Sequence, residues 1–217
     1  IHAPLINSML ARCLSASLLG FDAIPVTVEV DLAPGLPGLQ LVGLPDTAIQ
    51  ESRERVKAAL RNSGFRGPLV RVVVNLAPAD LRKEGPAFDL PIALALLVAS
   101  GQLDAPVLNG LWCAGDLELD GSIRPCRGIL AIACQAAEQD ARALAVSAGD
   151  AAEASLVTGL LIRSASTLRE LVDRLRSGPT EAHQRGRQSA QPATQQSAPA
   201  SESTQQLLHL PGQDLAR

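Results

Sequence analysis

The most chemically suggestive stretch of the chain is RKEGPAFDLPIALALL, residues 82–97. It begins with charged residues and a Gly-Pro pair, then continues into a segment that is apolar on every side. A polar turn that feeds a buried helix is a common way to present a catalytic residue. Within it, we expect Asp89 to cap the helix and Pro91 to lie in the first helical turn, where a missing N–H costs little. We interpret Lys83 as a solvated loop charge.

Two familiar kinds of site find no support in the sequence. The histidines His2, His183 and His209 all lie in the terminal parts, so a Ser–His or Cys–His pair has no base within the expected core. A GxxxxGK[ST] phosphate loop needs a lysine directly after a glycine, and neither Lys57 nor Lys83 follows one. We therefore expect this segment to bind no nucleotide and no other cofactor.

Residues that bind metals are also sparse. The cysteines are Cys13, Cys113, Cys126 and Cys134. They form no CxxC pair and have no histidine at ligand spacing, so we expect reduced, mostly buried thiols and no zinc site. Glu118 and Asp120 share a strand face and could hold a cation, but a solvated hairpin face is the favoured interpretation. The predicted metal site is none.

One basic feature remains, a stripe along a predicted helix. Arg53, Lys57 and Arg61 recur every four residues and therefore lie on one side of that helix. Such a stripe can contact phosphates or an acidic partner, although Glu51 and Glu54 dilute its charge. Three interpretations stay open, in this order of preference: a solvated surface of salt bridges, a contact between subunits, and a contact with DNA.

An α/β domain has to position these residues. The chain has 217 residues, of which 47% are hydrophobic and only 2% aromatic, so its core must be aliphatic. The net charge of −3 provides no global basic field. No run of about 18 apolar residues exists, and the N-terminus lacks the pattern of a signal peptide. We expect a cytoplasmic protein with no membrane partner.

Strands and helices follow from hydrophobic periodicity and turn residues. Strands are expected at 11–19, 24–32, 38–43, 69–78, 141–147 and 159–165. Helices are expected from the cap Asp46 to Gly64, after Asp89, and at 127–139, 150–157 and 166–178. Asp120-Gly121 predicts a hairpin turn, and Thr167 with Glu170 fits a capping box.

Composition divides the chain into four parts. Residues 9–176 are expected to form one folded domain, preceded by a non-native or disordered N-terminus over 1–8. Residues 177–206 are rich in Gln, Ser, Ala, Pro and Thr, which is typical of a disordered linker. Apolar residues return at 207–217, where we expect the start of a second domain that is missing from this chain.

Three motifs resemble a known family. They are PGLPGLQLVGLPDTAIQESRERVKAALRNSGF, NLAPADLRKEGPAFDLPIALALL and GDLELDGSIRPCRG. All are similar to the N-terminal domain of ComM-type proteins, also described as YifB-family or magnesium-chelatase-like (ChlI-like) AAA+ ATPases. The resemblance covers about residues 10–176, and LHLPGQDLAR near the end resembles the lead-in to the ATPase domain. It implies a Lon-protease-C-terminal-like fold (similar to ribosomal-protein-type domain 2), a mixed sheet with about four helices.

The resemblance also implies that the catalytic residues of a Lon-type peptidase are replaced in this chain. Lon-type peptidases pair a nucleophilic serine in a Gly-Pro-Ser-Ala turn with a lysine that follows a hairpin. By the resemblance, Ala87 lies at the serine position and Leu130 at the lysine position. A Ser–Lys dyad needs both an attacking oxygen and an amine, and these residues supply neither. The stretch that opens at Arg82 therefore resembles an active-site frame without its catalytic residues.

The function implied by the resemblance is a non-catalytic accessory domain. Its parent protein would be a homo-hexameric ATPase that uses ATP and Mg²⁺ to drive branch migration of DNA during natural transformation. The partners would be the domain's own ATPase domain, other subunits and, by one interpretation of the basic stripe, DNA. Two alternatives stay open: a Lon-like peptidase that works by unrecognised chemistry, and a metal-insertion component of the magnesium-chelatase type.

Overall fold

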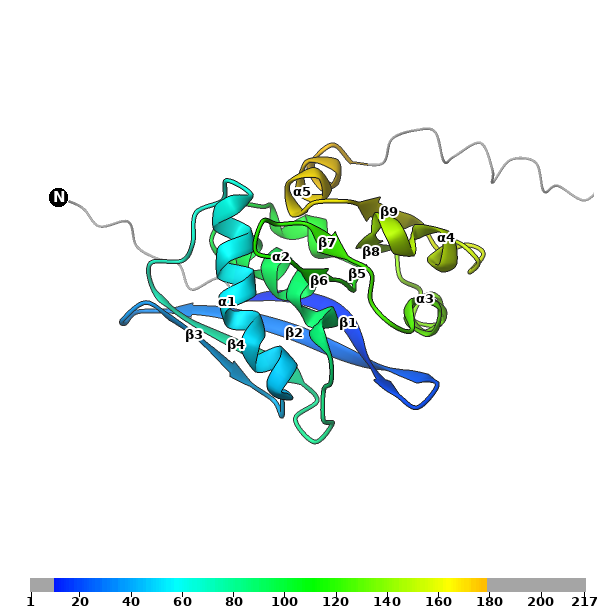
Figure 1. Ribbon diagram of the computed structural model, residues 1–217, viewed down its shortest axis with the longest axis horizontal. Helices are drawn as coiled ribbons and strands as arrows, with labels where there is room; N and C mark the ends of the chain where they lie inside the picture. Colours follow the sequence, from blue (N-terminus) through cyan, green and yellow to red (C-terminus); the bar gives the residue numbers. More distant parts are fainter. Residues whose placement is uncertain (1–9, 179–217) are drawn as a thin grey trace, which may run out of the picture. The chain divides into compact units, whose positions relative to one another are not determined.

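Residues 10–178 are the part of the chain that the computed structural model describes, and they fold around one large sheet (Figure 1). Its strand order is β3-β4-β2-β1-β5-β8-β9. The strands are β1 (Ala11–Leu19), β2 (Asp22–Ala33), β3 (Gly38–Val42), β4 (Arg71–Ala77), β5 (Leu111–Cys113), β8 (Ala143–Ser147) and β9 (Ile162–Ala165). β2 pairs antiparallel with both of its neighbours, and the other neighbouring pairs are parallel. The predicted α/β class with a mixed sheet is confirmed; the Lon-like assignment stays a prediction.

Five helices of the described part cover the two faces of this sheet (Figure 1). They are α1 (Thr47–Asn62), α2 (Asp89–Ala99), α3 (Ile129–Glu138), α4 (Ala151–Ala154) and α5 (Leu168–Arg176). α1, α2 and α5 share a core with one face, whereas α3 and α4 pack with the other. Strand β8 shows the division, because Ala143 and Ala145 belong to the first core and Leu144 and Val146 to the second. The five helices match the five expected from periodicity, one more than the resemblance implied, and the shortest is a single turn.

Helix α1 has the ends that its sequence predicts. The side chain of Asp46 accepts a hydrogen bond of 2.8 Å from the Ile49 N–H, so it caps the helix. The helix ends at Asn62, and Gly64 follows with a φ of 77°. Its buried positions fall on one face and are Ile49, Ser52, Val56, Ala59 and Leu60. That face rests on α2, which brings polar residues of α1 close to the start of α2.

Helix α2 is buried along its whole length. It packs against α1 on one side and against β1 and β2 on the other. A helix enclosed in this way needs no polar face, which explains why residues 89–99 show no amphipathic pattern. Because α2 lies between α1 and the sheet, the turn before it is covered by α1.

The predicted hairpin at Asp120-Gly121 is present as β6 (Asp116–Leu117) and β7 (Ile123–Arg124), which pair antiparallel. Its turn lies against the end of α1, because Asn62 Nδ2 donates to the Leu119 carbonyl over 2.6 Å. Gly121 has a φ of 92°, and a Cβ added there would overlap Ser63 Oγ. The positive φ and the nearby Ser63 side chain therefore favour glycine where the hairpin approaches α1.

The C-terminal helix begins with the predicted cap in a slightly altered form. Thr167 Oγ1 accepts from the Glu170 N–H over 3.2 Å. Glu170 Oε2 accepts in return from the N–H of Ser166, one residue before the cap, over 2.8 Å. α5 then ends at Arg176, which is where we expected the folded domain to end.

Several predictions concern residues outside the described part. These are the N-terminal residues 1–8, nearly all of the linker at 177–206, and the second-domain start at 207–217. Among residues 10–178, no helix combines the length and apolar character that a membrane span requires.

Candidate functional site

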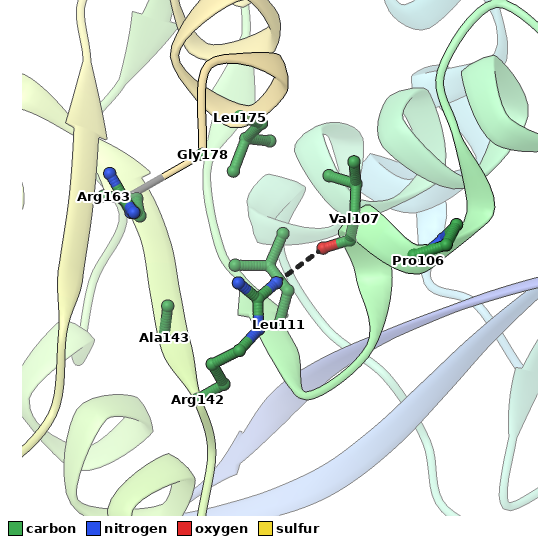
Figure 2. Close-up of a pocket in the computed structure, with 8 residues that line it drawn as sticks. All are labelled: Pro106, Val107, Leu111, Arg142, Ala143, Arg163, Leu175 and Gly178. Atoms are coloured by element: carbon green, nitrogen blue, oxygen red, sulfur yellow. Dashed lines mark hydrogen bonds between the residues drawn. The ribbon is translucent and has the colours of Figure 1, made fainter. Parts of the chain in front are cut away.

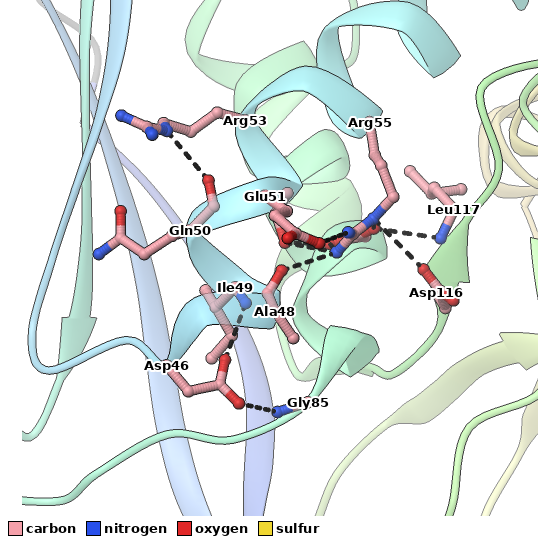
Figure 3. Close-up of polar contacts among 12 residues, drawn as sticks. Asp46, Ala48, Ile49, Gln50, Glu51, Arg53, Arg55, Gly85, Asp116 and Leu117 are labelled. Carbon is pink, nitrogen blue, oxygen red and sulfur yellow. Dashed lines mark hydrogen bonds and ion pairs between the residues drawn. The ribbon is translucent and has the colours of Figure 1, made fainter.

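Four polar side chains from three elements meet at the start of α2. Ser52 and Arg55 come from α1, Asp89 from the first turn of α2, and Asp116 from β6. We call this group the Arg55 cluster. Figure 3 shows the Arg55 side chain pointing from α1 toward Asp116 and the backbone of Leu117. The cluster therefore joins the helix α1, the turn before α2 and the hairpin.

Arg55 holds Asp89 through two parallel contacts. Its Nε lies 2.7 Å from Asp89 Oδ2, and its Nη2 lies 3.1 Å from Asp89 Oδ1. Nη2 also donates to the Ala48 carbonyl over 2.9 Å. Ser52 Oγ donates to Asp89 Oδ1, and the Leu117 N–H reaches Oδ2 over 3.4 Å. Asp89 has no exposed surface, so all its partners are fixed within the protein.

This arrangement corrects the expected role of Asp89. Phe88 is the cap residue of α2, and no side chain caps this helix. Its first N–H groups are served by backbone, since the Leu90 N–H donates to the Gly115 carbonyl over 3.0 Å. A paired arginine stabilises a fully buried carboxylate more strongly than a helix N-terminus does. The sequence prediction missed it because Arg55 lies 34 residues earlier in the chain.

Asp116 is the member of the cluster whose carboxylate is incompletely paired. Burial raises its pKa to about 6, and the neighbouring charge of Asp89 adds to this effect, while Arg55 opposes it. Asp116 Oδ1 lies 3.6 Å from Arg55 Nε and has no hydrogen bond among the described residues. The hydrogen bond from Arg55 to Asp89 raises the pKa of the guanidinium in turn. Arg55 Nη1 also lies 3.6 Å from Glu51 Oε2, so one arginine faces three carboxylates, and of these only Asp89 is hydrogen-bonded to it.

The Arg55 cluster contains no group able to attack a substrate. Ser52 is buried and donates its hydroxyl hydrogen to Asp89, and no histidine or lysine contacts it among the described residues. A serine nucleophile needs an adjacent base that can take its proton, and a carboxylate paired with arginine is a poor one. Within residues 10–178, no three His, Cys, Asp or Glu side chains are grouped so that they could hold a metal ion. The geometry is that of a clamp between α1, α2 and the hairpin.

The two positions assigned to a peptidase dyad lie on different elements. Ala87 is in the short helical turn Pro86–Phe88, where its carbonyl accepts from the Gly115 N–H over 3.0 Å. Leu130 is in α3, with 38% of its surface exposed. Neither side chain carries an atom able to transfer a proton or attack a carbonyl. Their assignment to Ser and Lys positions stays a prediction.

The expectation that Lys83 is a solvated charge is wrong. Its side chain is fully buried, and its Nζ donates to the Pro78 carbonyl. Burial lowers the pKa of this amine, and the charge of Asp80 partly opposes the effect. Its backbone continues the contact with the segment before α1, because the Lys83 N–H donates to the Leu44 carbonyl over 3.2 Å. The residues next to Lys83 in the sequence are charged, so they did not indicate that its side chain is buried.

A second contact ties the same loop to α1. Asp46, the cap of α1, uses its other carboxylate oxygen to accept from the Gly85 N–H over 2.9 Å, as Figure 3 shows. The Asp46 N–H donates to the Lys83 carbonyl over 3.1 Å. One acidic residue therefore fixes both the start of α1 and the Gly-Pro turn that precedes α2.

The basic stripe lies on the solvent side of α1. Arg53 and Arg61 are exposed and Lys57 is partly exposed. Arg53 Nε donates to the Gln50 carbonyl over 3.0 Å, and Lys57 Nζ lies 3.1 Å from Glu54 Oε1. These local contacts fit the solvated interpretation and leave the contacts with subunits or DNA as predictions.

The two carboxylates of the hairpin have local partners. Glu118 forms an ion pair with Arg124 across the hairpin. Asp120 accepts from the Ser122 N–H over 2.8 Å, which also lowers its pKa. These contacts are those of a solvated hairpin face, the interpretation favoured from the sequence.

The sequence reasoning missed Ser52 and Asp116. Ser52 and Arg55 are three residues apart on α1, a spacing that places both side chains on neighbouring positions of one face. A serine on the otherwise apolar side of that helix was the available signal. Asp116 gave none, because its burial depends on how the hairpin folds against α1.

Comparison with known proteins identifies the family. The family model described as subunit ChlI of Mg-chelatase matches residues 28–150. The chain belongs to this family. Within it, competence protein ComM of Haemophilus influenzae is 44% identical over 163 residues, which cover 75% of this chain and 32% of ComM. The uncharacterized protein YifB of Escherichia coli K12 is 45% identical over 141 residues, or 65% of this chain and 28% of YifB.

The similarity places this ChlI-family chain with ComM and YifB. It spans about a third of the length of these relatives. The segment matched by the ChlI model contains the whole Arg55 cluster and both proposed dyad positions, Ala87 and Leu130. The features described above therefore belong to the part of the chain that defines the family membership.

Proposed function

We propose that residues 10–178 are a non-catalytic accessory domain of a ComM-like ATPase that acts on DNA during natural transformation. The observation that carries the proposal is the 44% identity with the competence protein ComM over three quarters of this chain. Two polar residues of the Arg55 cluster, Arg55 and Asp89, pair with each other between α1 and α2, which is the arrangement of a structural contact.

The non-catalytic part of the proposal is supported by the chemistry of the Arg55 cluster. Its serine hydroxyl donates to Asp89, which Arg55 also holds, and by the resemblance Ala87 lies where a Lon-type peptidase has its nucleophile. Incubating the chain with a fluorophosphonate probe should produce no labelled serine. The double variant Ala87→Ser, Leu130→Lys should also stay inactive on casein. Leu130 is 38% exposed, so a lysine there would be only partly desolvated and would keep its proton, and nothing orients it toward residue 87. Labelling of the unmodified chain would establish a peptidase instead.

The motor itself belongs, in this proposal, to the part of the parent protein outside this chain. That part would bind ATP and Mg²⁺, assemble into a homo-hexamer and move branched DNA in the cytoplasm. Support comes from the resemblance described above and from the greater length of ComM and YifB. The domain's first partner would then be its own ATPase domain.

Transformation of Haemophilus influenzae tests the proposal directly. A strain without ComM would receive either a chimera in which residues 10–178 replace the matching ComM segment, or a ComM that lacks the segment. The chimera should restore transformation with homologous chromosomal DNA, and the truncated protein should not. Uptake of labelled DNA is the control, because it should be equal in all strains. Full activity of the truncated protein would contradict an accessory role for this domain.

The family description favours a second candidate, a metal-insertion component. The matched model is named for a subunit of Mg-chelatase. The parent protein, mixed with the other chelatase subunits and protoporphyrin, would then form magnesium protoporphyrin in an ATP-dependent way. Product formation together with a failed transformation assay would move the assignment to this candidate.

A further inference from the structure

A hollow lies beside α5 (Figure 2), and none of the residues that line it belongs to the Arg55 cluster. Its volume is about 200 Å³. Its walls come from η2 (Ala105–Leu108), β5, β8, β9 and α5, with the residues Pro106, Val107, Leu111, Arg142, Ala143, Arg163, Leu175 and Gly178. We call it the α5 pocket.

The pocket exists because small side chains lie where α5 crosses the sheet. On this face β8 contributes Ala143 and Ala145, and Ala145 is the neighbour of Arg163 in β9. An alanine fills little of the space between sheet and helix, so a gap remains between Leu111 and Leu175. The walls at Leu111 and Ala143 belong to the buried core, and the charged groups come from two arginines.

Arg142 is held in place by the backbone. Its Nε donates to the Asn109 carbonyl and its Nη2 to the Val107 carbonyl, both over 2.9 Å. Figure 2 shows the guanidinium in the middle of the pocket with the bond to Val107. A guanidinium has five N–H donors, so these two bonds leave others for a ligand.

Arg163 is the unusual residue of the pocket. It is partly buried, yet within residues 10–178 its guanidinium makes no hydrogen bond and no ion pair. No acidic residue lines the pocket. Partial burial of an unpaired charge costs free energy, and a bound anion would offset that cost. The α5 pocket therefore contains two guanidinium groups and no carboxylate, which favours the binding of an anion.

We propose that the α5 pocket binds a small oxyanion, a phosphate or carboxylate group, with Arg163 and Arg142 as its ligands. Guanidinium forks match the oxygens of both groups. The pocket is smaller than the roughly 300–1,000 Å³ of sites for drug-sized molecules, so it fits a small molecule or one group of a larger one. Apolar contacts with Leu111 and Leu175 would cover a short hydrocarbon portion. The accessory role proposed above assigns no ligand to this domain, and the two proposals stand independently.

Binding is tested by titrating the 217-residue chain with sodium phosphate and, separately, with sodium succinate. Ionic strength is held constant with chloride, and ¹H–¹⁵N spectra follow the Nε–H signals of the arginines. Saturable shifts of the Arg142 and Arg163 signals are expected with at least one anion. A response to phosphate alone, to succinate alone or to both identifies the chemical group, and each of these results supports the site. A pocket filled only by water would give no saturable shift with either anion.

Variants separate this site from general surface charge. Arg163→Gln should weaken binding by about tenfold or more, because the ligand loses a charge-assisted hydrogen bond in a partly buried place. Ala143→Val, which fills the hollow and keeps both arginines, should weaken binding as well. Arg66→Gln, which removes an exposed arginine elsewhere, is the matched control and should bind like wild type. The absence of saturable binding, or an equal loss in Arg66→Gln, would overturn the proposal.

Discussion

The position of Asp89 in the sequence suggests a different role from the one that its contacts show. As the first residue of α2, it has the place of a helix-stabilising acid, yet its carboxylate points to α1 and pairs with Arg55. The clamp matters for stability because each partner would be costly to leave alone. A buried ion pair adds little over a well-packed apolar pair, but breaking it leaves an uncompensated charge.

Arg55→Met should therefore destabilise the protein strongly. The free energy of unfolding should fall by about 3 kcal/mol, at the low end of the range for broken buried pairs, because the Arg55 side chain is 22% exposed. Urea unfolding followed by circular dichroism measures the change. Arg53→Met, two residues away and exposed, is the control and should shift the value by no more than about 0.5 kcal/mol. Equal effects in the two variants would show that Asp89 does not depend on Arg55.

Asp116 makes the stability depend on pH in the reverse of the usual direction for an acid. Its pKa is about 6 in the folded protein and 3.8 for the free side chain, so the folded state binds the proton more tightly in between. The contribution of this residue to stability should fall as the pH rises through about 6. Asp116→Asn removes the titration. The stability of wild type relative to this variant should rise by on the order of 1–2 kcal/mol from about pH 7.5 to about pH 4.5. A constant difference across that range would contradict the raised pKa.

At the scale of elements, helix α1 presents two different faces. One face packs on α2 and holds the clamp, while the stripe of Arg53, Lys57 and Arg61 faces solvent. The hairpin turn rests on the end of the same helix, and the Gly121 carbonyl accepts from the Leu168 N–H at the start of α5 over 2.8 Å. The hairpin therefore connects α1 to α5, which explains its close approach at Gly121.

Gly121→Ala tests that connection. An alanine would carry the strain of a positive φ and would also collide with Ser63 Oγ. Gly101→Ala is a matched control, because Gly101 has a φ of 67° but open space around the added Cβ. We expect Gly101→Ala to lower the free energy of unfolding by about 1 kcal/mol and Gly121→Ala by about 2–3 kcal/mol. Equal losses in thermal or urea unfolding would mean that the Ser63 side chain or the hairpin moves aside without cost.

At the scale of the whole molecule, the charged parts of the surface are candidates for contacts with other molecules. Two of the charged features that face solvent are the stripe on α1 and the opening of the α5 pocket. Contacts with a motor domain, a second subunit or DNA have to use such surfaces. The stripe is the feature that can separate these partners by experiment.

Changing Arg53, Lys57 and Arg61 together to Glu distinguishes the three interpretations of the stripe. If DNA binds there, affinity of the full-length parent protein should fall for every sequence, because phosphate contacts do not read bases. The slope of log affinity against log salt should flatten by up to about one unit for each lost phosphate contact. Unchanged affinity and slope would remove the stripe from the DNA path. Loss of oligomers in light scattering would assign it to a subunit interface.

Local patterns predicted most of the elements. The cap at Asp46, the stop at Gly64, the hairpin at Gly121 and the cap at Thr167 depend on residues within four positions of each other, and all are present. Errors occurred at Lys83 and Asp89, where the outcome depends on distant segments. Lys83 is buried through its contacts with Leu44 and Pro78, and Asp89 is paired through α1.

The sequence by itself determined the class of fold, the aliphatic core and the family, because periodicity and long motifs are properties of neighbouring residues. Only the tertiary structure decided where the charges go. It buries Asp89 against Arg55 and leaves one carboxylate oxygen of Asp116 without a hydrogen bond. It also buries Lys83 and, among the described residues, leaves Arg163 unpaired in the pocket that Arg142 lines. Burial and pairing determine the free energy of a charge, and both arise from segments brought together across the sheet and helices.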